Sequence, residues 1–115
     1  MRFLAMHRID EQAPEWDPSP EFIEAMGAFM QQAADAGVLI TAEGVHKSDR
    51  GALVRHAGGR TKVTDGPFTE AKEVIGGFAL INAKDRAEAV EWCSRYAELF
   101  GNVEVEVREV FEFEG

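Results

Sequence analysis

The spacing of apolar residues in the first part of the chain predicts a strand, a helix and a second strand. Residues 2–7 form an apolar stretch too short for a helical repeat, and an acidic segment with prolines follows at residues 10–20. Beyond it, apolar residues recur at helical spacing, with Ser19 placed to cap the helix and Gly37 placed to end it. Residues 38–45 are rich in β-branched side chains and predict the second strand.

A glycine pair in the middle of the chain predicts a β-hairpin. Residues 52–57 and 60–64 are strand-like segments that flank the pair Gly58-Gly59. Two successive glycines readily adopt the positive φ angles of a two-residue turn, so we expect the two segments to pair with each other.

The last third of the chain predicts a strand, a helix and a closing strand. Residues 74–81 resume an apolar strand pattern, and Gly76-Gly77 within them predicts a bulge or a close approach of a backbone or ligand. Asp85 can cap a helix whose apolar face ends near Gly101. Valines then alternate with charged residues, which predicts a long one-faced strand over residues 103–113, bulged where its parity breaks.

Without the hairpin, the order strand, helix, strand, strand, helix, strand predicts one α+β domain, residues 1–115, of ferredoxin-like (split βαβ) fold. The hairpin is then an insertion, and two helices cover one face of an antiparallel sheet. The strands carry apolar residues in both parities, as in Phe3 with Leu4 and Val38 with Leu39. The other face should therefore also be buried, and a sheet-to-sheet homodimer is the simplest way to bury it.

Composition narrows the range of partners. The 115 residues are 45% apolar and 29% charged, with a net charge of −9, so nucleic acid is not an expected partner. No apolar run approaches the roughly 20 residues that span a bilayer, and the start of the chain lacks the pattern of a signal peptide. We expect a cytoplasmic protein without a membrane partner, in which the single cysteine, Cys93, is a buried thiol on a helix face.

The expected topology brings several polar residues to one edge of the sheet. The first two strands of the fold run in the same direction and the strand over 74–81 runs against them, so His7, His46 and the loop over residues 65–73 should converge. The start of the first helix lies at the same edge, where its free N–H groups would favour a small anionic ligand.

Each of these residues also has a structural interpretation. Asp65 precedes Gly-Pro, and its carboxylate can accept a backbone hydrogen bond two residues on; alternatively it orients a histidine or acts as a general base. His7 is as well explained as an interior polar group as by catalysis, and His46 and His56 lie in turn contexts typical of solvated groups. Glu70, Lys72 and Glu73 resemble an exposed charged turn. The scattered histidines and the absence of a phosphate loop predict neither a metal site nor a nucleotide cofactor.

Residues 63–73, Val-Thr-Asp-Gly-Pro-Phe-Thr-Glu-Ala-Lys-Glu, followed by Ile-Gly-Gly-Phe at 75–78, closely resemble the signature of the DGPF proteins, a branch of the YciI-related family. The resemblance extends across nearly the whole chain, including the start of the second helix and the closing valine-rich strand. It implies a dimeric α/β-barrel assembly of ferredoxin-like subunits.

The resemblance also implies a site built on a histidine and an aspartate in a cleft. Asp65 matches the family aspartate. The family histidine lies near the start of the first helix, and residues 15–22 of this chain hold none, so the histidine is either missing or supplied by His7. The implied activity is a cofactor-free lyase or dehydrochlorinase-like step with Asp65 and His7 as proton-transfer groups. The expected ligand contacts are His46, Pro67, Phe68, Gly76 and Gly77.

A second hypothesis comes from a different class of function. DGPF proteins are often encoded beside sigma factors of the extracytoplasmic-function type, which implies a regulatory or accessory protein without catalysis. Its acidic surface would then dock a basic partner. The surface acids that would carry such docking are Glu104, Glu106, Glu112 and Glu114.

Overall fold

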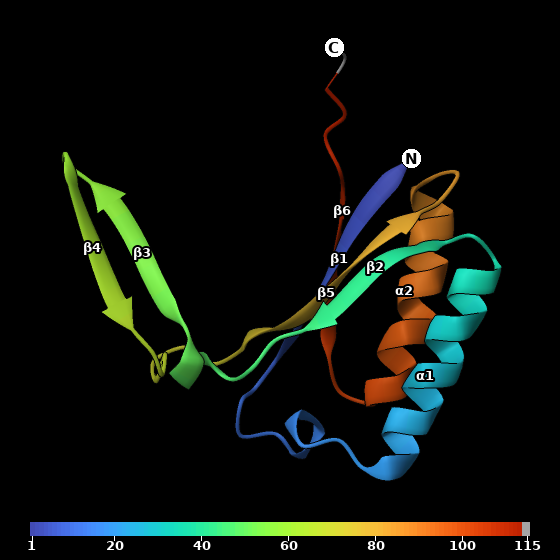
Figure 1. Cartoon of the computed structure of the whole chain (residues 1–115), viewed down its shortest axis with the longest axis horizontal. Coiled ribbons are helices and arrows are strands. Elements are labelled where there is room, and N and C mark those ends of the chain that lie inside the picture. The colour runs from blue at the N-terminus through green and yellow to red at the C-terminus, as the bar shows by residue number, and fades with distance from the viewer. Residues whose placement is uncertain (114–115) are drawn as a thin grey trace.

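The computed structural model describes residues 1–113, the side chain of Glu15 excepted, as one antiparallel sheet covered on one face by two helices. The sheet has four strands in the order β2-β5-β1-β6 (Figure 1). The strands are β1 (Arg2–Ile9), β2 (Leu39–Gly44), β5 (Val74–Asn82) and β6 (Glu104–Glu109), and the helices are α1 (Pro20–Asp35) and α2 (Arg86–Phe100). This mixed arrangement is compatible with a ferredoxin-like α+β fold.

The ends of both helices confirm the predicted capping signals. The Ser19 hydroxyl accepts a hydrogen bond from the Phe22 N–H at 3.1 Å, and the Asp85 carboxylate accepts one from the Glu88 N–H at 2.9 Å. Gly37 and Gly101 follow the helices with φ angles of 75° and 83°, a region that side chains disfavour. Each helix therefore begins and ends where the sequence predicts.

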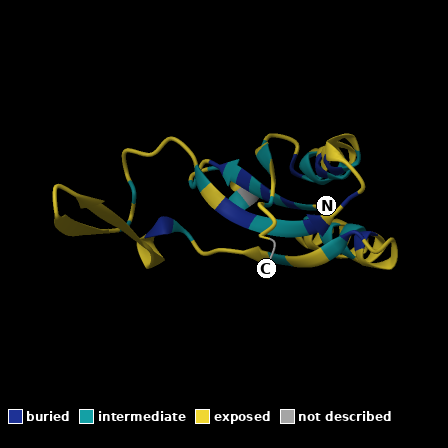
Figure 2. Cartoon of the chain, turned by 90° about the horizontal axis from the view of Figure 1, so that it is seen from above, coloured by how far each residue is buried: buried dark blue, intermediate teal, exposed yellow. Residues whose placement is uncertain are grey.

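The core lies between the helices and one face of the sheet. Along β1 every second residue is buried, and the most deeply buried of them, Phe3, is 2% exposed. Figure 2 shows buried and half-buried residues along the sheet and on the helix sides that face it. The buried cluster joins β1, the residue before β2, the end of β5 with the residue after it, and α2: Phe3, Ala5, Val38, Ile81, Ala83, Ala89 and Cys93.

A two-stranded hairpin projects from this body between β2 and β5. Its strands are β3 (Ala52–Ala57) and β4 (Arg60–Asp65), and Gly58 and Gly59 turn between them with φ angles of 58° and 75°. We call residues 52–65 the arm; every one of them is exposed (Figures 1 and 2). The radius of gyration, 16.0 Å, exceeds the roughly 13 Å expected for a compact chain of this length, because the arm extends away from the body.

The two glycines within β5 produce the predicted bulge. His7 pairs with Gly77 and Arg8 pairs with Ile75, so Gly76 has no opposite residue on β1. The bulge lies near the end of β1, which continues to Ile9 rather than ending at His7 as predicted.

The closing strand is shorter than predicted. β6 ends at Glu109, and the last hydrogen bond of the pairing runs from the Val110 N–H to the carbonyl of Arg2, the first residue of β1. Beyond that point no strand remains to pair with, so the break in parity at Glu109 and Val110 marks the end of the strand and not a bulge. Phe111 and Phe113 follow, 75% and 87% exposed.

Candidate functional site

A cavity of about 390 Å³ opens in the body beside His7. It is bounded by β1, β2, β5, both helices and the short turn at Pro14–Trp16, labelled η1. Most of its surface is apolar or aromatic, as in ordinary small-molecule sites. The lining residues are His7, Ile9, Trp16, Pro18, Phe22, Met26, Met30, Ala42, Glu43, Gly44, Val45, Gly76, Phe78, Tyr96 and Phe100.

His7 is a buried histidine held by aromatic side chains of α2. Its ring centroid lies 4.8 Å from that of Phe100, and its Nδ1 lies 2.7 Å from the phenol oxygen of Tyr96. Nε2 has no hydrogen-bond partner among the described residues, and none of their fully buried polar side-chain atoms lacks one. Nε2 is therefore not fully buried, and the cavity that His7 lines gives it access.

Burial sets the protonation states of this pair. It lowers the pKa of His7 and raises the pKa of Tyr96, to which the nearby Cys93 thiol adds. Both side chains are therefore uncharged near neutral pH. In the tautomer in which Nδ1–H donates to the phenol oxygen, Nε2 carries no proton, so this nitrogen can accept one while Nδ1 stays bonded to Tyr96.

The glycine pair in β5 makes room for the imidazole. A Cβ atom on Gly76 would collide with Nε2 of His7 and lie 2.8 Å from its Cδ2. A Cβ atom on Gly77 would lie 2.8 Å from Cε1 of the same ring. The Glu43 carbonyl makes the predicted backbone approach at Gly77, 2.7 Å from its Cβ position, and the His7 side chain, which was not predicted there, approaches both glycines. The sequence-predicted residues His7, Gly76 and Gly77 do lie together.

Asp65 lies elsewhere. It is the last residue of β4, opposite Ala52 at the root of the arm, and it is exposed. Its carboxylate makes no hydrogen bond within the described residues, and it is not part of the lining of the His7 cavity. The backbone bond expected two residues on cannot form, because that residue is Pro67, which has no N–H.

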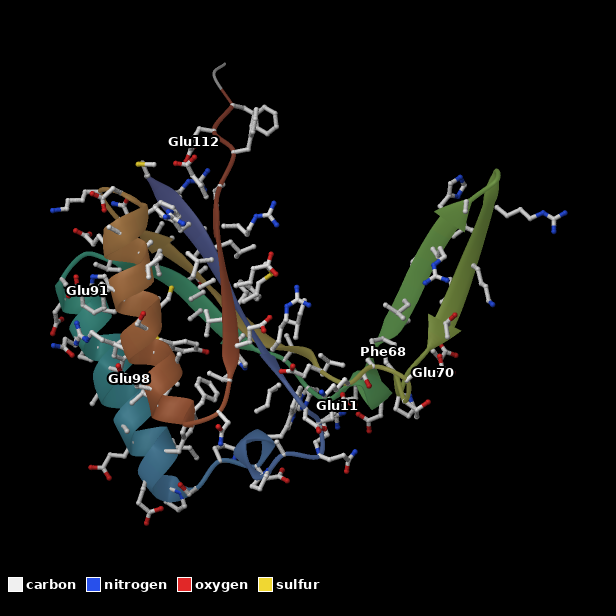
Figure 3. All side chains as sticks on the ribbon, turned by 180° about the vertical axis from the view of Figure 1, so that it is seen from behind. Glu11, Phe68, Glu70, Glu91, Glu98 and Glu112 are labelled. Atoms are coloured by element: carbon white, nitrogen blue, oxygen red, sulfur yellow. The ribbon has the colours of Figure 1, made fainter. Side chains whose placement is uncertain are left out.

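The segment that follows Asp65 fastens the arm to the body. The Phe68 N–H donates to the Ser48 hydroxyl at 2.8 Å, and that hydroxyl donates to a carboxylate oxygen of Glu11 at 2.9 Å. The other carboxylate oxygen of Glu11 accepts from the Ser48 N–H. Figure 3 shows Glu11 and Phe68 together at the foot of the arm. We call Glu11, Ser48 and Phe68 the anchor.

Gly66 completes this packing. Its N–H donates to the Gly51 carbonyl at 2.8 Å, and a Cβ atom on Gly66 would collide with the Ser48 carbonyl oxygen. Ser48 is the first residue of the short helix η2 (Ser48–Arg50). The Asp-Gly-Pro-Phe segment therefore has a structural part in this fold, which joins three loops that are far apart in the sequence.

His46 is exposed and lies on the other side of the end of β2. Its Nε2 accepts a hydrogen bond from the Arg50 guanidinium at 3.2 Å. It lines an open groove of about 740 Å³ together with Phe68, Glu73 and other residues near the anchor. This groove and the His7 cavity share Gly44 and Val45. The sequence predicts that His7, His46 and the loop over residues 65–73 meet at one edge of the sheet. In the structure, His7 lines one cavity with Gly76, and His46 lines a second cavity with Phe68.

Tyr96 is the functional candidate that the sequence analysis missed. It lies on the apolar face of a predicted helix, where an aromatic residue is ordinarily a core residue. A phenol buried in such a position needs a hydrogen-bond partner, and this requirement could have indicated that Tyr96 contacts a polar side chain such as His7. His56, by contrast, lies in the arm with Nδ1 2.6 Å from the Thr61 hydroxyl.

Three further features bear on function within the described residues: the grouping of metal-ligating side chains, the cysteine, and the length and polarity of the helices. No three side chains of His, Cys, Asp or Glu within residues 1–113 gather closely enough to hold a metal ion. Cys93 is buried, as predicted, and burial raises the pKa of its thiol to about 11. No described helix is both long and apolar enough to cross a membrane.

Comparison with known sequences places this geometry in context. The YCII-related domain matches residues 1–114 of the chain. An uncharacterized protein of Rhizobium meliloti (strain 1021) is 34% identical over 67 residues, which is 58% of this chain and 54% of that protein. The match therefore spans only about half the length of that relative.

Proposed function

The chain belongs to the YCII-related family, and from that premise we propose that it binds a small weak acid in the His7 cavity and transfers a proton there without a cofactor. The observation that carries the proposal is the His7 imidazole. It is buried, uncharged and bonded to Tyr96 through Nδ1, while Nε2 has access to the cavity. These are the properties of a general base held in one orientation.

The chemical character of the ligand follows from the lining. Aromatic and aliphatic side chains dominate it, so most of the ligand is apolar, as in an aromatic or unsaturated ring. Glu43 lines the cavity from β2, but its pairing with Phe78 places its carboxylate on the other face of the sheet, so the charge of the lining comes from His7 when that side chain is protonated. A carbonyl or carboxyl compound bound with its acidic C–H group beside Nε2 would meet a neutral imidazole that is free to take that proton.

The reaction class that fits is an elimination. Nε2 of His7 takes a proton from a carbon next to a carbonyl or carboxyl group, and the electrons of that C–H bond form a C=C bond. A leaving group on the adjacent carbon, such as chloride, departs with its bonding electrons. The imidazolium keeps its Nδ1–H bonded to the Tyr96 oxygen, and solvent later removes the proton from Nε2.

Three further features belong to the proposal. Membership of the DGPF branch of the family is supported by the sequence Asp-Gly-Pro-Phe at residues 65–68. The apolar residues on the uncovered sheet face support a homodimer, and the composition supports a cytoplasmic protein. The proton-transfer role predicted for Asp65 requires its carboxylate to reach His7. Asp65 does not line the His7 cavity, so the present proposal relies on His7 and Tyr96 instead.

The acidic surface favours a second candidate, a non-catalytic accessory protein of an extracytoplasmic-function sigma factor system. Glu104 and Glu109 are exposed and take part in no ion pair among residues 1–113. Glu106 and Glu112 are already paired with arginines, and Glu114 lies outside the described residues. Free surface acids of this kind could bind a basic segment of a partner protein.

A binding screen separates the two candidates. Trp16 lines the cavity and Trp92 does not, so Trp92→Phe leaves one fluorescent reporter at the site. Small carboxylic acids and phenols are screened by ligand-detected NMR, and hits are titrated by Trp16 fluorescence. We expect His7→Gln to weaken a hit about tenfold or more and Tyr96→Phe about fivefold, which correspond to 1.4 and 1 kcal/mol.

His56→Gln is the matched control, because His56 is exposed in the arm. A hit whose affinity survives His7→Gln would overturn the proposed site. An absence of hits in every form of the protein would favour the accessory role. Chloride release from β-chloro acids by the wild type, lost in His7→Gln, would establish the elimination.

A further inference from the structure

We infer that the arm is a docking element for a second copy of this chain, with its basic face on the acidic rim of the partner's open sheet face. The inference rests on the homodimer of the proposed function and adds how the two copies recognise each other. In the single chain the apolar side chains of the arm are exposed, and its basic side chains form no ion pair among residues 1–113.

Most of the arm is left uncovered by the rest of residues 1–113. Its apolar side chains Leu53, Val54 and Val63 are 50%, 68% and 59% exposed. An isolated two-stranded hairpin is only marginally stable in water, because it has no third layer to bury its faces. Yet the anchor holds the root of this hairpin in place, because two hydrogen bonds join Ser48 to Glu11 of the body and a third joins Phe68 to Ser48. A fixed but uncovered hairpin is the form expected of a surface that is buried in an assembly.

The charges of the arm also lack partners. Arg55 lies directly opposite Lys62, and like charges in that position destabilise a strand pair. Arg60 pairs with Ala57, which places it on the same face as Arg55 by strand alternation. None of the ion pairs within residues 1–113 includes any of the three. An acidic surface laid on this face would turn the repulsion into attraction.

The body of the same protein supplies such a surface. The arm has three basic residues and one acidic residue, a net charge of +2, and the whole chain carries −9, which leaves −11 for the remainder. On the sheet face away from the helices, Glu104 lies opposite Arg8 and Glu43 lies opposite Phe78. The arginines of this face, Arg2, Arg8 and Arg108, pair with Glu112 or Glu106, which leaves Glu43 and Glu104 without an ion pair among residues 1–113. These acids flank the two sides of an apolar centre made by the cross-strand pairs Leu4–Leu80 and Met6–Phe78.

A second copy of the chain would both cover the exposed arm and supply acidic partners for its basic side chains. One chain carries both the basic arm and the acid-rimmed apolar face, so a twofold arrangement buries each of them twice. Nucleic acid does not fit, because a body of net charge −11 would repel phosphates beside the arm. The geometry therefore points to reciprocal contact between arms and open faces.

The test reverses the charge of the arm. Sedimentation velocity over a concentration series compares the wild type with Arg55→Glu/Lys62→Glu, and we expect the dimer dissociation constant to rise at least tenfold. Lys84→Glu/Arg86→Glu changes the net charge equally at the exposed start of α2 and should leave that constant within about twofold. Glu43→Lys/Glu104→Lys, added to the arm variant, should restore the dimer. Arg55→Gln/Lys62→Gln serves as a second arm variant should the reversal disturb folding.

The outcomes separate the two levels of the proposal. A wild-type dimer that tolerates both arm variants would overturn the docking role and leave the homodimer intact. A monomeric wild type would overturn the homodimer and the docking role together. Binding in the His7 cavity is measured on its own by Trp16 fluorescence, so loss of the arm contact does not count against the proposed ligand site.

Discussion

The cavity and the arm both depend on a glycine pair, but for opposite reasons. In the body, Gly76 and Gly77 are needed for space, because a side chain at either would collide with the His7 ring. In the arm, Gly58 and Gly59 have positive φ angles, and a Cβ atom on either would meet nothing within 4 Å, so they are needed for conformation. The comparison separates a region whose side chains are packed within one chain from a region whose side chains are exposed.

The largest effect is expected from filling the space beside His7. In Gly77→Ala the new methyl group lies 2.7 Å from the Glu43 carbonyl oxygen, which belongs to the backbone and cannot turn away. We expect the free energy of unfolding to fall by about 3 kcal/mol, with ligand binding lost as the imidazole moves. Urea denaturation measures the first change and Trp16 fluorescence the second.

Gly27→Ala is the control for this substitution. Gly27 is exposed in α1 with nothing within 4 Å of its Cβ position, so alanine there should stabilise the protein by about 0.5–1 kcal/mol. If Gly77→Ala were as well tolerated as Gly27→Ala, the glycine pair would not be holding the His7 site.

The next effect breaks the junction between the two regions. Ser48→Ala removes the hydroxyl that accepts from the Phe68 N–H and donates to Glu11. Ser48 is 7% exposed, so the groups left without a partner are poorly solvated, and we expect a loss of about 2 kcal/mol. Hydrogen exchange should rise in β3 and β4 while the amides of β1 stay protected. Equal loosening of β1 and the arm would mean that the anchor belongs to the body's core and not to the arm.

The local elements were predictable from the sequence, and the partners of side chains were not. Ser19, Asp85 and the glycine turns act within a few residues, so each signal predicted its own element correctly. The end of β6 depends on where β1 begins, a residue 108 positions away from Val110, and the prediction overran it. The His7–Tyr96 contact joins residues 89 apart and left no local signal beyond a phenol on an apolar helix face.

A smaller effect concerns pH and isolates His7 within the body. Burial lowers the pKa of His7 below its ordinary value of 6.5, so between those two values the unfolded chain binds more protons than the folded one. Stability is then complete above about pH 6.5 and falls as the pH drops through the pKa of folded His7. His7→Gln should flatten this slope in urea denaturation between pH 5 and 7, and His56→Gln should keep it. An unchanged slope in His7→Gln would assign the pH dependence to other groups.

The smallest effect is expected at Asp65, where sequence and structure point in different directions. Asp65 is exposed at the root of the arm and its carboxylate has no hydrogen-bond partner within residues 1–113. We therefore expect Asp65→Asn to change the free energy of unfolding by less than about 0.5 kcal/mol and to leave the affinity of a cavity ligand unchanged. A variant that folds normally but loses binding would contradict this expectation. Since Asp65 does not line the cavity of its own chain, the carboxylate would then have to reach it from a moved arm or from the second copy of a dimer, which would join the two regions in one site.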